Sequence, residues 1–349
     1  IHIYNIMVCV AMALLLVTGC ASPQPDSVLP DAADGYGAEL DRLDRELAKR
    51  DAYIAARNAR IDSLRALREA ESPAEALVHT SEIADLYRGF LSDSALVECA
   101  RGEKLANELK DSVMAFRMRL ERIQQMPLAG FGYAAVEEFE KMPLDSMSYA
   151  GRTMALWAGR QMYSYIAAQY PNFPEEEERW NAKATEVQGR LVGMLDPDSP
   201  DMLLNAGEYE FMKGNDTRAC AILTELFERI DRDSNMAARV ASLIGQVLSR
   251  QGRVDESLYY LALSAIADVR SATREVTSLQ QLGIALYEKG DVSRADYYLQ
   301  EALASAVECH ASMRMLQTSE AIPLISAASR EAASRNRARL YCVLCLMAL

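Results

Sequence analysis

The residue types that most often carry chemistry in proteins, histidine and cysteine, are few in this sequence and widely spaced. There are three histidines and seven cysteines among 349 residues. The nearest approach to a metal pair is Cys309 followed by His310, and two adjacent residues on a helix point in different directions. The cysteine spacing fits neither a zinc site nor a disulfide framework. We therefore expect no metal site, buried thiols, and a surface imidazole.

Motifs for enzymatic catalysis are also missing from the sequence. There is no Gly-rich loop between a strand and a helix, no nucleophile elbow and no His-Glu-x-x-His motif. Three histidines and no recognisable strand leave little for a general acid–base pair. We predict no catalytic residues, no cofactor and a non-enzymatic function.

One cysteine does lie in a context with specific chemistry. Residues 6–17 form an apolar run with the length of a secretory signal, too short to span a bilayer. The run leads into LVTGC at 16–20, which resembles the bacterial lipobox, where the thiol receives a diacylglycerol and becomes the mature N-terminus. Residues 1–20 are therefore predicted to be a signal and lipobox segment, with Cys20 as the lipidation site. The alternative is an ordinary signal peptide cleaved near Ala21.

The composition predicts an all-α protein. Half of the residues are hydrophobic but only 7% are aromatic, and the dominant Ala, Leu, Glu, Arg and Met are helix formers. Runs of alternating β-branched residues with turn signals are nearly absent. The formal net charge of −13 argues against a nucleic-acid surface, which needs clustered Lys and Arg.

The elements that would position a binding surface begin after a short tether. Residues 21–37 contain three prolines and two glycines without a helical pattern, and are predicted to be a linker. Residues 38–70 are predicted to form one long charged helix, with apolar residues at a spacing of seven, namely Leu40, Leu47, Ile54 and Ile61. Because Arg50 and Arg57 interrupt this stripe, we favour a first helix lying on the next one over a coiled coil.

Three segments further along the chain align without gaps. They are residues 203–227, 241–265 and 279–303, each offset by 38 residues from the one before. Each has a glycine, a second glycine seven residues later, a small residue five further on, and a leucine four after that. These residues are Gly207, Gly214, Ala219 and Leu223; Gly245, Gly252, Ser257 and Leu261; and Gly283, Gly290, Ala295 and Leu299. Such a period indicates a repeat of helix pairs.

The spacing can be interpreted as helix packing. The first glycine would let two antiparallel helices approach closely, and the second would end the first helix in the left-handed conformation. The small residue would fit against the first glycine, and the leucine would fill the seam to the next repeat. The pattern resembles the tetratricopeptide repeat (TPR), usually 34 residues long, and predicts a right-handed α-solenoid. We assign residues 201–335 to these repeats and residues 71–200 to degenerate ones.

A more specific resemblance covers roughly residues 40–340. The sequence resembles membrane regulators of Bacteroides-type Gram-negative bacteria that carry a family-specific domain of unknown function. The residues that carry it are YYLALSAIADVRSATREVTSLQQLG at 259–283, Gly290-Asp291, Ala295-Asp296-Tyr297, MRMLQTSEAIPLI at 313–325 and LDRELAKRDAYIAARNARIDSLR at 43–65. The resemblance implies an exported TPR region, one transmembrane helix and a cytoplasmic part that is often labelled a transcriptional regulator. None of the residues that carry the resemblance corresponds to this cytoplasmic part.

The last ten residues, 340–349, carry no charge. As a helix they would span about 15 Å, half of the hydrocarbon core of a membrane. A helix that caps a solenoid needs a polar outer face, which this run lacks. We therefore expect the start of a transmembrane helix, with a packed capping helix as the alternative.

Two non-enzymatic functions are consistent with these features. In the first, the chain is a periplasmic TPR sensing and interaction module of a membrane-anchored regulator and binds a peptide or protein. In the second, it is a lipid-anchored TPR scaffold lipoprotein at a periplasmic membrane face. Attachment would come from the N-terminal lipid, the C-terminal helix or both. A ligand is expected on the concave face formed by the first helices of the pairs, with Tyr209, Gln246 and Gln280. The sequence does not predict the oligomeric state.

Overall fold

The computed structural model describes residues 35–310, except Asp233, Glu275 and Val276, and scattered residues between 315 and 337. These belong to one compact unit, Gly35–Leu349. The predictions for Cys20, for most of the linker 21–37 and for the apolar segment 340–349 lie outside the described residues. In the described part every regular element is a helix, which confirms the all-α fold class.

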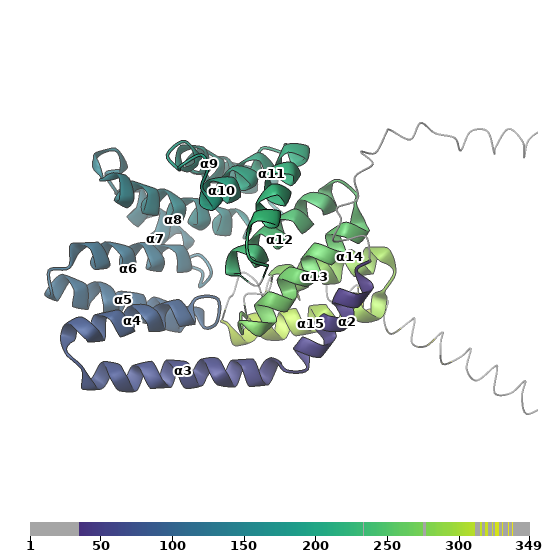
Figure 1. The fold of residues 1–349 in the computed structure, drawn as a ribbon, viewed down its shortest axis with the longest axis horizontal. Helices are drawn as coiled ribbons and strands as arrows, with labels where there is room; N and C mark the ends of the chain where they lie inside the picture. Colours follow the sequence, from purple (N-terminus) through teal and green to yellow (C-terminus); the bar gives the residue numbers. More distant parts are fainter. Residues whose placement is uncertain are drawn as a thin grey trace, which may run out of the picture. The chain divides into compact units, whose positions relative to one another are not determined.

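Successive helices form the pairs of a TPR-like solenoid, and Figure 1 shows the pairs stacked along the unit. The pairs are α4 (Pro73–Tyr87) with α5 (Ser92–Glu108), α6 (Ser112–Gln125) with α7 (Gly132–Glu140), α8 (Tyr149–Ala167) with α9 (Pro174–Val192), α10 (Pro200–Met212) with α11 (Asp216–Arg229), α12 (Asn235–Arg250) with α13 (Val254–Arg270), and α14 (Thr277–Lys289) with α15 (Val292–Glu308). A short 3₁₀ helix, η2 (Leu144–Ser146), precedes α8.

Local sequence sets where these helices begin and end. Ser72 accepts a hydrogen bond from the backbone of Glu75 while the Glu75 side chain accepts one from Ser72, so α4 starts with a capping box. At the other end of the first helices, α10, α12 and α14 are each followed by a glycine with positive φ. These glycines are Gly214, Gly252 and Gly290, with φ of +80°, +75° and +95°. This is the left-handed conformation expected at those three positions.

The first glycine of each repeat lies where the paired helix comes closest. A Cβ added to Gly207 would lie 2.6 Å from Leu223, and one added to Gly245 would lie 2.7 Å from Leu261. The small residue also contacts this region, since Ser257 donates a hydrogen bond of 2.8 Å to the Gly245 carbonyl. The leucine therefore packs over the first glycine of its own pair, whereas we had expected it at the seam to the next repeat.

The predicted long helix over 38–70 is divided into α2 (Gly37–Leu47) and α3 (Arg50–Ala70). The physical reason is that its apolar stripe serves two different cores. Leu40, Leu43 and Leu47 join a cluster formed with the last helix pairs, whereas Ile61 and Leu64 join a cluster with α4. A bend between α2 and α3 lets each half face its own core.

The first helix does not lie only on its neighbour, as the sequence suggested, but packs on the last repeats. The Leu43 side chain shares a core with Leu258, Leu282 and Leu299. The Tyr298 hydroxyl of α15 donates a hydrogen bond of 2.6 Å to Asp44 of α2. Figure 1 shows α2 beside α13 and α15, so that the first and last turns of the solenoid meet.

A second set of contacts, the closure joint, connects α3 and the α4–α5 loop to the last two pairs. Arg57 donates hydrogen bonds to the carbonyls of Leu86 (2.7 Å) and Ser271 (2.6 Å). The guanidinium groups of Arg57 and Arg274 both lie over the buried Phe90 ring, at 5.0 and 4.2 Å. Arg57, one of the two arginines that interrupt the apolar stripe, thus holds the unit closed.

Backbone and ionic contacts complete this joint. The Arg274 N–H donates to the Gly89 carbonyl at 2.7 Å, and the Ser92 N–H donates to the Cys309 carbonyl at 3.0 Å. Arg50, the other interrupting arginine, forms an ion pair of 2.8 Å with Glu308. Burial and the nearby Arg88 charge lower the pKa of Arg57 to about 10.

The contacts between α2 and the last repeats also predict that stability depends on pH. Hydrogen bonds from Arg270 of α13, Tyr53 and Lys49 lower the pKa of Glu46 in α2 from its ordinary value of 4.5 to about 2. Because the folded-state pKa is the lower one, this carboxylate contributes stability above about pH 4.5, and the contribution is lost as the pH falls through about 2. Glu46→Gln should therefore lower the melting temperature at neutral pH, and its difference from the wild type should disappear toward pH 2.

Thermal unfolding followed by circular dichroism across this pH range measures the difference. The matched control is Glu39→Gln, which removes an ion pair within α2 only and should cost less at neutral pH. A Glu46→Gln difference that stays constant down to pH 2 would show that this carboxylate does not contribute through its charge.

Candidate functional site

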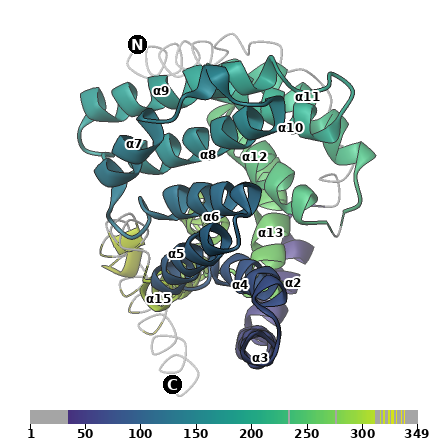
Figure 2. The ribbon, with the colours of Figure 1, turned by 90° about the vertical axis from the view of Figure 1, so that its left-hand side faces the viewer.

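The first helices of four consecutive pairs line a cavity of about 340 Å³, called here the inner cavity. Figure 2 shows α6 and α8 side by side, and α10 contacts α12. The residues that line the inner cavity are Arg117, Leu120, Glu121 and Gln124 of α6; Thr153, Met154 and Trp157 of α8; Asp201, Leu204 and Asn205 of α10; Arg239 of α12; and Arg88, Leu191 and Leu195 nearby. A cavity on the first helices of a TPR-like solenoid is where a ligand was expected.

One side of the inner cavity is an ionic network that is already neutralised. Arg117 contacts Glu121 at 2.8 Å and Asp85 at 3.1 Å. Arg88 contacts the same Asp85 at 3.1 Å. Burial and the neighbouring Asp85 charge raise the pKa of Glu121, and the hydrogen bond from Arg117 opposes that shift. This side therefore fixes α6 against α4, and its charged side chains are paired with one another.

Arg239, on the other side, has a different environment. Its guanidinium carbon lies 5.9 Å from the centre of the Trp157 ring. Arg239 lines the cavity as an exposed residue, and desolvation by the protein around its guanidinium group lowers its pKa. Glu208 and Asp201 act on it electrostatically, but within the described residues no carboxylate oxygen lies within the 4.0 Å of an ion pair.

Buried polar groups lie next to Arg239. Arg160 forms an ion pair of 2.8 Å with Glu208, and both side chains are largely buried. Among the described side chains, Gln124 Oε1, Gln161 Oε1, Arg160 Nε and Glu208 Oε2 have no hydrogen-bond partner. Buried polar atoms are normally paired, so these four atoms leave hydrogen-bonding capacity unused in the packed interior.

The three residues predicted for the concave face do not line the inner cavity. The Tyr209 ring packs on α9, where a Cβ added to Gly189 would lie 3.1 Å from its hydroxyl. Gln246 donates to the Ser242 carbonyl at 3.3 Å, and Gln280 is half-buried. On α12, Gln246 lies two turns after Arg239, and Gln280 belongs to α14, which contributes no residue to the cavity. The assignment of these three residues to a ligand-binding face stays a prediction.

Sequence reasoning missed Arg239, Trp157 and Gln124. Trp157 is one of two tryptophans in the chain and offered the only available signal, a large aromatic residue beside polar neighbours on a helix. Neither Arg239 nor Gln124 lies in a recognisable motif, because the cavity that they line is formed by residues from several helix pairs.

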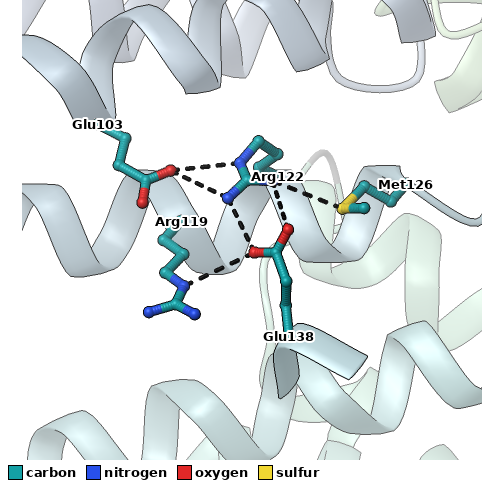
Figure 3. A network of polar contacts seen from close by, with 5 residues as sticks. All are labelled: Glu103, Arg119, Arg122, Met126 and Glu138. Carbon is teal, nitrogen blue, oxygen red and sulfur yellow. Dashed lines mark hydrogen bonds and ion pairs between the residues drawn. The ribbon is translucent and has the colours of Figure 1, made fainter. Parts of the chain in front are cut away.

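A second polar network, shown in Figure 3, is structural. Arg122 of α6 binds both oxygens of Glu138 of α7 at 2.9 Å, and also Glu103 of α5 at 3.2 Å. Arg119 lies 3.7 Å from the same Glu138, and Met126 accepts a weak contact from Arg122. An open hollow of about 670 Å³ lies beside Glu103 and Arg122. The network ties three helices together, and its charges are paired with one another.

The residues first considered for chemistry have structural surroundings. Cys99, Cys220 and Cys309 are buried thiols, and Cys309 Sγ lies 3.6 Å from Ser92 Oγ in the closure joint. His310 is exposed and bonds Asp93 at 2.8 Å. Over the part of the chain that the structure describes, no group of three or more potential ligands is placed to hold a metal ion. Nor does any helix in this part have the length and apolarity needed to cross a membrane.

Comparison with protein families gives one match. Residues 47–320, more than half of the chain, match the family described as the SusR N-terminal TPR domain. A search among curated proteins finds no match.

Proposed function

The chain belongs to the SusR N-terminal TPR domain family, and on this basis we propose that it is the sensing module of a membrane-anchored regulator, which binds a peptide or protein. A TPR domain of this type is a protein-interaction module, and such folds typically serve as non-enzymatic scaffolds. The proposal adds to this a ligand site, a sensing role and a place in the periplasm.

The inner cavity is the observation that carries the proposal. It combines an exposed arginine, Arg239, an apolar surface at Trp157 and Met154, and polar side chains such as Gln124 and Asn205. A few polar groups that converge on a mostly apolar hollow are typical of ligand sites. The hollow also lies across four helix pairs, so an occupant would change how those pairs contact one another.

Export and membrane attachment rest on the sequence. The LVTGC segment at 16–20 supports lipidation at Cys20, and the apolar residues 340–349 support a following membrane helix. The second candidate function, a lipid-anchored scaffold lipoprotein, shares the first of these features. A membrane span and a cytoplasmic domain encoded after residue 349 would favour the regulator, and a stop codon there would favour the scaffold.

Site-specific photocrosslinking in living bacteria tests the proposed binding. A photoreactive amino acid would replace Met154, which is 37% exposed in the inner cavity, or Val113, which is 76% exposed and outside it. We expect a defined crosslinked protein or peptide, identified by mass spectrometry, from position 154 and not from position 113. Crosslinking only from position 113, or the same products from both positions, would contradict binding in the inner cavity.

A further inference from the structure

The α4–α5 loop, residues 88–91, borders both the inner cavity and the closure joint. The Arg88 side chain lines the inner cavity and contacts Asp85 at 3.1 Å. The backbone of the same residue belongs to the joint, since its carbonyl accepts a hydrogen bond of 3.2 Å from Arg57. The next carbonyl, that of Gly89, accepts one of 2.7 Å from the Arg274 N–H. A displacement of this loop would therefore change the cavity wall and the joint together.

One carboxylate connects this loop to the cavity wall formed by α6. Asp85 contacts Arg88 through one oxygen and Arg117 of α6 through the other, each at 3.1 Å. Arg117 also contacts Glu121 of the same helix at 2.8 Å. In the described part of the chain, the side-chain polar contacts of Arg117 are with these two carboxylates. An effect of Arg117 on the joint must therefore pass through Asp85 and the loop.

The closed joint carries energetic costs of its own. Two of the three non-glycine residues with positive φ in the described part, Ala272 and His310, follow α13 and α15 at the joint, with φ of +53° and +56°. Side chains disfavour this left-handed conformation. Burial lowers the pKa of Arg57, and the neighbouring charges of Arg88 and Arg274 lower it further. Such costs persist only where the surrounding contacts sustain them, so a ligand can bias the balance between the closed and open joint.

We propose that the closure joint is a latch controlled by the inner cavity, in which an occupant that contacts Arg88 favours the closed joint. The reason is that only the closed joint holds the α4–α5 loop in place as a wall of the cavity. An occupant that uses this wall binds the closed form more tightly, and this difference in affinity shifts the population. The inference rests on the proposed function and adds a mechanism of regulation to it: binding tightens the contacts between the first and last helices. The coupling is reciprocal, so opening the joint weakens binding in the cavity.

Two backbone amides report directly on the joint. The Ser92 N–H donates to the Cys309 carbonyl at 3.0 Å, and the Arg274 N–H donates to the Gly89 carbonyl at 2.7 Å. Hydrogen–deuterium exchange of these amides in the full chain, followed by mass spectrometry with residue-resolving fragmentation, measures how often the joint opens. Helix α11 contributes no residue to the inner cavity or the joint, so its amides are the internal reference for general destabilisation.

Removal of one contact in the cavity wall tests whether the wall controls the joint. Arg117→Gln should speed exchange of both joint amides by at least about threefold, the factor that a partly exposed ion pair supports, and should leave α11 unchanged. The matched control is Arg119→Gln on the same helix. The side chains of Arg117 and Arg119 are 40% and 38% exposed, but Arg119 contacts Glu138 instead of Asp85. This control should leave exchange of both joint amides unchanged.

A covalent occupant tests the direction of the coupling. Met154→Cys modified with benzyl methanethiosulfonate places a benzyl group in the inner cavity, where its aromatic face is available to the Arg88 guanidinium. Val113→Cys carries the same group at an exposed position outside the cavity, and the wild-type chain treated alike corrects for reaction at native cysteines. With the group at position 154, the joint amides should exchange at least about threefold more slowly, the same factor in the opposite direction. With the group at position 113, they should exchange at the wild-type rate.

The latch requires the expected result in both experiments. Unchanged joint exchange in Arg117→Gln, or faster exchange that α11 shares, would reject control of the joint by the cavity wall. Unchanged or faster joint exchange with the benzyl group at position 154 would reject stabilisation of the closed joint by an occupant. Either result leaves ligand binding in the cavity in place, and photocrosslinking from position 154 decides the proposed function independently.

Discussion

Replacing Leu43 with alanine is expected to destabilise the last helix pairs of the solenoid, although Leu43 lies near the start of the described chain. Its side chain is 0% exposed and belongs to one core with Leu258, Leu282 and Tyr298. Truncation of a fully buried leucine removes transfer free energy and leaves a cavity, at a cost of about 2–5 kcal/mol. Denaturant unfolding measures this cost, and hydrogen exchange shows where the native state opens.

We expect the amides of α14 and α15 to exchange faster in Leu43→Ala, since α2 covers their core. The matched control is Leu67→Ala in α3, where the leucine is 41% exposed and the same truncation should cost less than about 1 kcal/mol. Faster exchange confined to α2 itself, with α14 and α15 unaffected, would show that the ends of the solenoid are not energetically coupled.

The packing of the first helices on the last repeats changes how the stability of the repeats is distributed along the solenoid. In an open solenoid each repeat contacts only its neighbours, so stability is nearly a sum of local terms. Here α2 and the closure joint connect the first turns to the last, through contacts such as Arg57 with Ser271 and Arg50 with Glu308. These contacts join residues far apart in sequence, so we expect them to form late in folding. The inner cavity lies within the part that they hold together.

The repeat glycines could be placed from the sequence because their physics is local. The positive φ of Gly252 depends on the end of a single helix, and the close approach at Gly245 depends on one helix pair. A period of 38 residues then repeats the same local rule three times. Helix type, the ends of the first helices in the last three pairs and the TPR-like fold follow from these signals and from composition.

The closure and the cavity could not be predicted, because each is made by residues that no period connects. Arg50 and Arg57 were visible as charges on an apolar stripe, but nothing in the sequence pairs them with Glu308 or Ser271. The sequence also does not indicate which residues line the cavity. The cavity takes residues from α6, α8, α10 and α12, and which residues of each helix reach it depends on how successive pairs turn.

Gly283→Leu should destabilise the last pair through overpacking, at about 1–3 kcal/mol. A Cβ at this position would already lie 2.8 Å from Leu299 Cγ and 3.3 Å from the Ala295 carbonyl oxygen, and the rest of a leucine has no free volume to enter. Because the carbonyl belongs to the backbone of α15, the two helices must separate rather than repack one side chain. Denaturant unfolding measures the loss, with Glu288→Leu as the control, since it places the same side chain on the exposed face of α14.

Combining Gly283→Leu with Leu299→Ala should cost less than the sum of the single changes, by about 0.5–3 kcal/mol, because the truncation opens the space that the new leucine needs. Strict additivity of the two changes, or unchanged unfolding for Gly283→Leu, would show that this glycine does not set the spacing between α14 and α15.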